Sequence, residues 1–291
     1  MSVAKGYTAP MQQHFHRGLL ALVAVAAALC SACFQSDTVI RVKADGTGTI
    51  EQTNLANKEM LGMAASMAKQ AVQSSGSDAS RAPNLDNIGD LFDEAKIREQ
   101  ASSFGQGVRF VSSTPVSQSG LTGVTSTFAF DDVRLLNLSS RQNGAASGPP
   151  TPQLRFEVDR AEGGDSILRV RLPAGHPPDD QATTAAPTTA APRPDLPPEA
   201  LAMVRNMFKG ARMTVAVEVD GAIVTTDGPK RDGSRVTIFA LDFEQLLSDP
   251  SKFSALQSMK PGSDFATARK ALEGVPGVIL PETPTVTIQY R

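Results

Sequence analysis

The chain has very little of the residue types on which most enzyme active sites depend. Its 291 residues include three histidines, two cysteines and no tryptophan, and only 5% are aromatic. His14 and His16 precede an apolar amino-terminal run, and His176 lies in a proline-rich stretch. This inventory argues against a Ser-His-Asp triad, a Cys-His dyad and a zinc site built from histidine and cysteine.

The sequence also lacks the short motifs and the charge pattern of the common ligand-binding classes. It contains no G-x-S-x-G elbow, no phosphate-binding Gly-Lys-Ser/Thr loop and no G-x-G-x-x-G fingerprint, and we therefore expect no cofactor. Its formal net charge is −2, and basic residues do not gather into a patch. Nucleic acid is therefore not expected as a partner, since binding to it requires a clustered basic surface.

What the sequence does have is one long apolar run, in the stretch "GLLALVAVAAALCSACFQSD", 18–37. Two cations, Lys5 and Arg17, precede it without any acidic residue, and the run itself ends at Leu29. It is shorter than the roughly 18–20 apolar residues that a membrane-spanning helix needs. A basic region, a short apolar region and small residues together are typical of a secretory signal peptide.

The end of this run resembles the signal of bacterial lipoproteins, which is cut by signal peptidase II. In that family an apolar residue and two small residues precede the cysteine that receives the lipid, and Ser31-Ala32-Cys33 fits the last three positions. Cys30 stands where leucine is usual. The resemblance implies that residues 1–32 are removed and that Cys33 becomes the lipidated first residue, which attaches the chain to a membrane.

The same resemblance implies a location in the cell envelope. In the family an aspartate directly after the cysteine marks retention in the inner membrane, and this chain has Phe34 there. We therefore expect an anchor in the outer membrane with the protein facing the periplasm, while the inner membrane and the cell surface stay open. The alternative from the residues themselves is an uncleaved single-pass anchor, because the charge-free span extends from Gly18 to Ser36.

A chain that begins at Cys33 would be mildly acidic and would have no free thiol. Because residues 1–32 contain two basic residues and no acidic one, 28 basic residues fall to 26 against 30 acidic ones. Its net charge is then −4, which mainly favours solubility. Its only histidine would be His176.

Composition divides the mature chain into four parts. We expect an amino-terminal α+β unit over 33–140, a hairpin over 141–172 that continues its sheet, and a carboxy-terminal α+β unit over 199–291. The last unit could form one domain with the first. Between them, 173–198 is rich in alanine, threonine and proline, and such a segment buries too little apolar surface to become ordered.

Alternating apolar residues predict three hairpins. The first follows "TVIRVKADGTGTIEQ" from Thr38, the second joins "QLRFEVDR" to "SILRVRL", and the third turns near Asp220-Gly221. Helical spacing predicts helices over about 88–104, up to about Lys209, over about 243–247, and from Ser263 to Gly274. Runs of hairpins with a few helices favour an α+β fold, in which helices cover one face of an antiparallel sheet.

Three aspartates are the remaining candidates for chemistry. Asp131 and Asp132 follow the strand-like "TFAF", and Asp242 follows "TIFAL". Two such acids could act as general acid and base in a hydrolase if they lay about 5–10 Å apart across a groove. The competing interpretation is that they cap the short helices that follow, as aspartate commonly does.

The order of the predicted elements after Cys33 also resembles bacterial envelope lipoproteins of similar length, a resemblance that brings no catalytic residue with it. The leading hypothesis is therefore a non-enzymatic, lipid-anchored envelope protein that binds a protein partner or an apolar ligand. The alternatives are a carboxylate-dependent periplasmic hydrolase that uses the three aspartates, and a membrane-anchored spacer.

Overall fold

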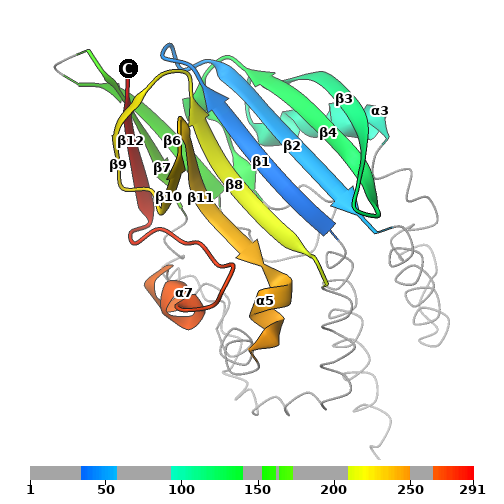
Figure 1. Ribbon diagram of the computed structural model, residues 1–291. Helices are drawn as coiled ribbons and strands as arrows, with labels where there is room; N and C mark the ends of the chain where they lie inside the picture. The colour runs from blue at the N-terminus through cyan, green and yellow to red at the C-terminus, as the bar shows by residue number, and fades with distance from the viewer. Residues whose placement is uncertain (1–33, 58–92, 140–152, 162–163, 173–208, 250–264) are drawn as a thin grey trace, which may run out of the picture.

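The computed structural model describes residues 34–57, 93–139, 153–161, 164–172, 209–249 and 265–291. These residues form two β-sheets and several short helices (Figure 1). The predicted signal peptide, Cys33, the linker over 173–198 and most of the helix predicted before Lys209 lie outside the described residues.

The larger sheet has seven strands, and two strands far apart in the sequence, 34–42 and 212–219, lie side by side at its centre. The order is β10 (Lys230–Asp232), β11 (Arg235–Asp242), β8 (Arg212–Val219), β1 (Phe34–Val42), β2 (Gly48–Ala56), β4 (Leu121–Phe130) and β3 (Arg109–Gln118). All neighbours are antiparallel except β1 and β8, which run parallel. Strands from 33–140 and from 199–291 therefore lie in one sheet.

The second sheet has five strands in the order β5 (Leu138–Ser139), β6 (Gln153–Arg160), β7 (Ser166–Arg171), β12 (Thr285–Tyr290) and β9 (Ile223–Thr226). Its paired strands are antiparallel. The last strand of the chain, β12, lies between β7 and the edge strand β9 (Figure 1).

The described helices are short. They are α3 (Glu94–Gln100), α5 (Phe243–Ser248) and α7 (Phe265–Leu272), together with the 3₁₀ turns η3 (Ala101–Phe104) and η4 (Val133–Leu135). The Asp93 carboxylate begins α3 by accepting hydrogen bonds from the backbone N–H groups of Ala95 and Lys96.

The main core lies between the two sheets. Ile40 pairs with Ile50, and Ile50 pairs with Phe128, so these fully buried side chains share one face of the larger sheet. They belong to the same apolar cluster as Leu168 and Ile288 of the smaller sheet. Each fully buried side chain of this size contributes about 1.5–3 kcal/mol to folding.

This arrangement shows that the predicted fold class is wrong. The sequence predicted an α+β protein in which helices cover one face of a hairpin-built sheet. In the described residues, a second sheet covers that face, and the longest helix has eight residues. The reason is that alternation marks one apolar face on each strand but does not say whether a helix or another sheet will cover it.

Two of the three predicted hairpins are confirmed. β1 pairs with β2, and β6 pairs with β7, each in antiparallel register. The third prediction is wrong, because β8 pairs with β1 and β11 while β9 pairs with β12 in the other sheet. At Gly221, where φ is +147°, the chain passes from one sheet to the other, and a β-carbon there would collide with the carbonyl oxygen of Arg291.

Candidate functional site

The end of the larger sheet at which β1 begins adjoins the predicted lipidation site. Cys33 itself lies outside the described residues, but it is bonded to Phe34, which already pairs with Ala56 of β2. On the other side of β1, Gln35 pairs with Arg212 of β8. Consecutive α-carbons are about 3.8 Å apart, so Cys33 is the residue next to the first residue of β1, which is paired on both sides.

Asp132 acts as a helix cap at the opposite end of the sheet. Its carboxylate accepts a hydrogen bond from the backbone N–H of Arg134 at 2.9 Å and so begins η4. The Arg134 guanidinium also binds it, at 2.7 Å. The hydrogen bond from this guanidinium lowers the pKa of Asp132 below its ordinary value, which favours a charged carboxylate over a proton donor.

The neighbouring Asp131 is an exposed ion-pair partner. Its Oδ1 lies 2.6 Å from Nη1 of Arg109, at the start of β3. Both side chains are more than 60% exposed, so the pair contributes little to stability.

Asp242 caps α5 and lies far from the other two acids. Its Oδ1 accepts from the backbone N–H of Gln245 at 3.0 Å. Asp242 pairs with Arg212 in the cross-strand row of Gln35, whereas Phe130, which precedes Asp131, ends the row of Val42.

The two rows are separated by the strand from Gln35 to Val42, which corresponds to about 23 Å at 3.3 Å per residue. That is more than twice the largest spacing of about 9.5 Å between the two carboxylates of a glycosidase. The structure thus confirms the capping interpretation for Asp132 and Asp242 and does not bring these acids together.

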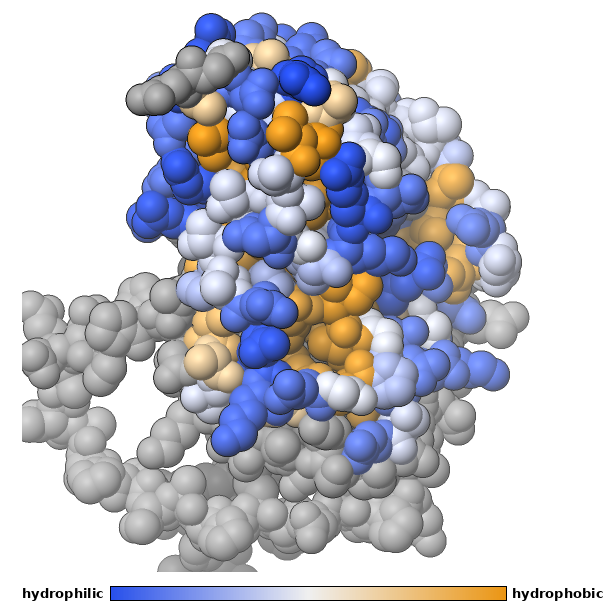
Figure 2. Space-filling view, turned by 60° about the vertical axis from the view of Figure 1, so that its left-hand side comes forward, coloured by the Kyte–Doolittle hydropathy of each residue, from blue (hydrophilic) through white to orange (hydrophobic). Residues whose placement is uncertain are grey.

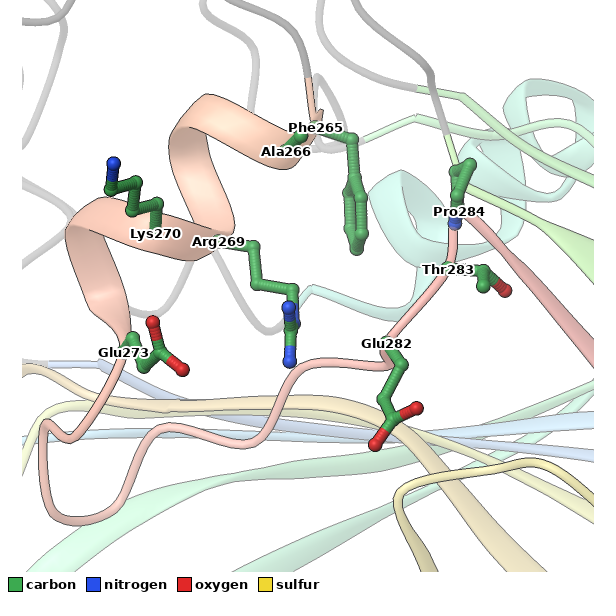
Figure 3. A pocket seen from close by; sticks show the side chains of 8 residues that line it. All are labelled: Phe265, Ala266, Arg269, Lys270, Glu273, Glu282, Thr283 and Pro284. Carbon is green, nitrogen blue, oxygen red and sulfur yellow. The ribbon is translucent and has the colours of Figure 1, made fainter.

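A groove between α7 and the segment before β12 is a second candidate site. It has a volume of about 550 Å³, within the usual range for ligand pockets. The ring of Phe265 and the guanidinium of Arg269 point from α7 toward the segment Glu282–Pro284 (Figure 3). Figure 2 shows this side of the molecule, on which hydrophilic residues surround a hydrophobic patch.

The lining combines an apolar floor with charges of both signs. Phe265 packs against the core cluster from a partly buried position, and Pro284 lies across the groove from it. The charged lining consists of Arg269, Lys270, Glu273 and Glu282. Such a surface can hold an apolar side chain and pair with charges beside it.

Sequence analysis did not identify this groove. The two cations in "FATARKALE" were visible on a predicted helix, but Glu282 and Pro284 lie in a turn with no helix or strand pattern. The two pieces meet because the chain turns back after α7, with Ile279 bridging to Ala240 of β11 before β12 begins.

Within the part of the chain that the structure describes, every helix is too short or too polar to cross a lipid bilayer. Among the same residues, no three histidine, cysteine, aspartate or glutamate side chains cluster closely enough to hold a metal ion.

Comparison with known proteins adds one distant likeness. No protein-family model matches the chain, and no curated protein matches it. The NMR structure of the folded domain of LppM from Mycobacterium tuberculosis is similar over 89% of this chain and 90% of that one, with 15% identity and a TM-score of 0.30. A TM-score this low carries no argument about fold or function, and no family is assigned.

Proposed function

We propose that this chain is a lipid-anchored protein of the bacterial cell envelope that binds a partner and does not catalyse a reaction. The observation that carries the proposal is the Ser31-Ala32-Cys33 motif, which ends one residue before the first strand of the fold. Residues 1–32 would then be a removable signal, and the folded body would begin at the lipid. The proposed location is the outer membrane, facing the periplasm.

The geometry of the aspartates supports a binding role over the hydrolase alternative. Asp132 and Asp242 are engaged as helix caps, and Asp131 pairs with Arg109. An acid and a base for hydrolysis must face one cleft and have different pKa values. Asp242 lies at the opposite end of the sheet from Asp131 and Asp132, so it faces no cleft together with them.

The anchor is tested by the mass of the amino-terminal peptide of protein purified from membranes. We expect a peptide that begins at Cys33 and carries a diacylglyceryl group and an amide-linked acyl chain. Cys33→Ser should abolish the modification, whereas the matched control Cys30→Leu should retain it, because leucine is the usual residue there and residue 30 leaves with the signal. A peptide that begins at Met1 would instead support a single-pass anchor and refute the lipidation.

For the partner, we propose that the groove beside α7 binds a polypeptide segment of another envelope protein. Phe265 offers an aromatic contact at its floor, and Arg269, Lys270 and Glu282 offer both signs of charge at its rim. An interface with an apolar centre and a charged rim suits a peptide that alternates apolar and charged residues. A purely apolar ligand would leave these charges without partners.

The groove is tested with a photo-crosslinking amino acid placed at Lys270, and at Val224 as the control. Both side chains are exposed, and Val224 lies on β9 of the smaller sheet rather than in the groove. Irradiated cells should give a discrete adduct from position 270 and none from position 224. Equal labelling at both positions, or at neither, would refute the groove as the binding site.

A further inference from the structure

We infer that the folded body stands on the bilayer by one end of its larger sheet, with the β1–β2 turn and the carboxy terminus facing away. This inference rests on the proposed lipidation of Cys33. It goes further because it names the surface that meets the lipid headgroups. The surface consists of the start of β1, the end of β2, the start of β8, the β3–β4 turn and the beginning of α5.

The first step is covalent. The lipid would be carried by Cys33, and the next residue, Phe34, pairs with Ala56, which pairs with Thr122 of β4, which pairs with Ser117 of β3. A whole cross-strand row therefore lies at the level of the anchor. One peptide bond joins the lipid-bearing residue to the sheet, so its α-carbon is about 3.8 Å from that of Phe34 in this row.

The second step is that neither broad face of the molecule suits contact with a bilayer interior. On the outer face of the larger sheet, Arg41 pairs with Glu51 at 2.9 Å and with Glu218 at 3.5 Å, and Arg235 pairs with Asp37 at 3.3 Å. On the outer face of the smaller sheet, Arg171 pairs with Glu157 at 3.0 Å, and Arg169 pairs with Asp159. Burying such pairs in lipid would cost more than their mutual attraction returns.

The third step concerns the charge of the anchored end itself. Among its described residues, the cations Lys209 and Arg212 are matched in number by Asp242 and Glu244. Glu244 also accepts a hydrogen bond from the backbone N–H of Gly210, at 2.9 Å. The described residues of this end include no basic cluster that would attract anionic lipids, so we expect the lipid on Cys33 to hold it there.

Depth measurements on the lipidated full chain test the orientation. A chain that begins at lipidated Cys33 has no free thiol, so one introduced cysteine takes one fluorescent label. Arg212→Cys lies in the row of Gln35, and Asp220→Cys lies just beyond the opposite end of the same strand, about 26 Å away. The vesicles are phosphatidylcholine containing a lipid with a quenching headgroup.

We expect the label at position 212 to lose most of its fluorescence and the label at 220 to keep it. A second matched pair uses two exposed serines of β3: Ser117→Cys, in the row of Phe34, should be quenched several-fold more than Ser112→Cys, in the row of Val39. Replacing an exposed serine by cysteine is a small change. The serine pair therefore still tests the orientation if Arg212→Cys or Asp220→Cys misfolds.

The outcomes separate the two proposals. If the amino-terminal mass shows the lipid but both labels of a pair are quenched equally, the body lies flat and the orientation is refuted while the anchor stands. If the mass shows no lipid, the proposed function fails first. Replacing half of the phosphatidylcholine by phosphatidylglycerol should leave the quenching order unchanged, and a reversed order would also overturn the inference.

Discussion

Along β1 and β2, the inner face of the seven-stranded sheet has an apolar half and a polar half, and the two are held in different ways. Toward the β1–β2 turn, Ile40, Ile50 and Phe128 form a fully buried cross-strand row. Two residues along each strand toward the end at which β1 begins, the equivalent row is Thr38, Gln52 and Ser126, all at most 7% exposed. Further still, Ser36 and Asn54 hydrogen bond at 3.1 Å.

The comparison shows where the free energy of folding is concentrated. Apolar burial contributes about 25 cal/mol per Å², whereas a buried polar group gains only about 0.5–1.5 kcal/mol net from its hydrogen bond. Among the described residues, no buried side-chain nitrogen or oxygen lacks a hydrogen-bond partner. The side chains of the polar half therefore have hydrogen-bond partners but add little stability. The apolar half, near the β1–β2 turn, should contribute most of the free energy of folding.

The largest expected effect comes from Phe128→Ala in the apolar half. Phe128 is fully buried, and its ring centroid lies 4.7 Å from that of Phe104 and 6.0 Å from that of Phe110. Loss of such a ring leaves a cavity and should lower the free energy of unfolding by about 3–5 kcal/mol, measured by denaturant unfolding. The exposed control Ser112→Ala should stay within about 0.5 kcal/mol. A loss below about 1 kcal/mol for Phe128→Ala would contradict the comparison.

A smaller effect is expected from Tyr290→Phe, at the same end of the core. The fully buried Tyr290 donates a hydrogen bond from its hydroxyl to the carbonyl oxygen of Lys43, at 3.2 Å. Removing the hydroxyl should cost about 1 kcal/mol at neutral pH.

We also expect the destabilisation caused by Tyr290→Phe to depend on pH. Burial raises the pKa of Tyr290 above its ordinary value of 10.0, so the folded state holds the phenolic proton more tightly than the unfolded state does. That stabilisation is complete below pH 10 and is lost as the pH rises through the folded-state pKa. The gap in unfolding free energy between wild type and Tyr290→Phe should therefore shrink or reverse above pH 10. A constant gap would show that the phenol titrates alike in both states.

The smallest effect is expected from Ser126→Ala in the polar half. Ser126 is 2% exposed and lies between Gln52 of β2 and Ser113 of β3. Replacing its hydroxyl by hydrogen should change the unfolding free energy by about 0.5 kcal/mol, because the lost hydrogen bond is offset by a less polar interior. Denaturant midpoints measured beside those of Phe128→Ala would decide, and a loss of comparable size would remove the distinction between the halves.

The sequence predicted the strands well because their determinants are local. Alternating residues define β1, β6 and β12, and Asp45-Gly46 gives the β1–β2 turn, where Gly46 has a φ of +85°. The caps Asp132 and Asp242 were equally readable, since an aspartate before a short helical segment commonly binds its first N–H groups.

The sequence does not show which strands pair with one another or what covers their apolar faces. The predicted fold class and the third predicted hairpin were wrong for this reason. β8 carries an apolar face that fits any neighbouring strand, and its partner β1 lies far away in the sequence. Gly221 looked like a hairpin turn because glycine permits many turns, and only the packing against Arg291 fixes its role. The predicted site Cys33 remains a prediction, and the groove was not predicted because part of its lining, Glu282–Pro284, comes from a turn with no helix or strand pattern.

The parallel pairing of β1 with β8 has a consequence for the order of folding. Gln35 of β1 hydrogen bonds to the carbonyl oxygen of Gly210, 175 residues later. One edge of β1 therefore stays unpaired until β8 has been synthesised. Contacts between residues so far apart in the sequence slow folding. Until β8 arrives, that bare edge can pair with other chains. A newly synthesised molecule would therefore be most prone to aggregate beside β1, and chaperone protection would matter most there.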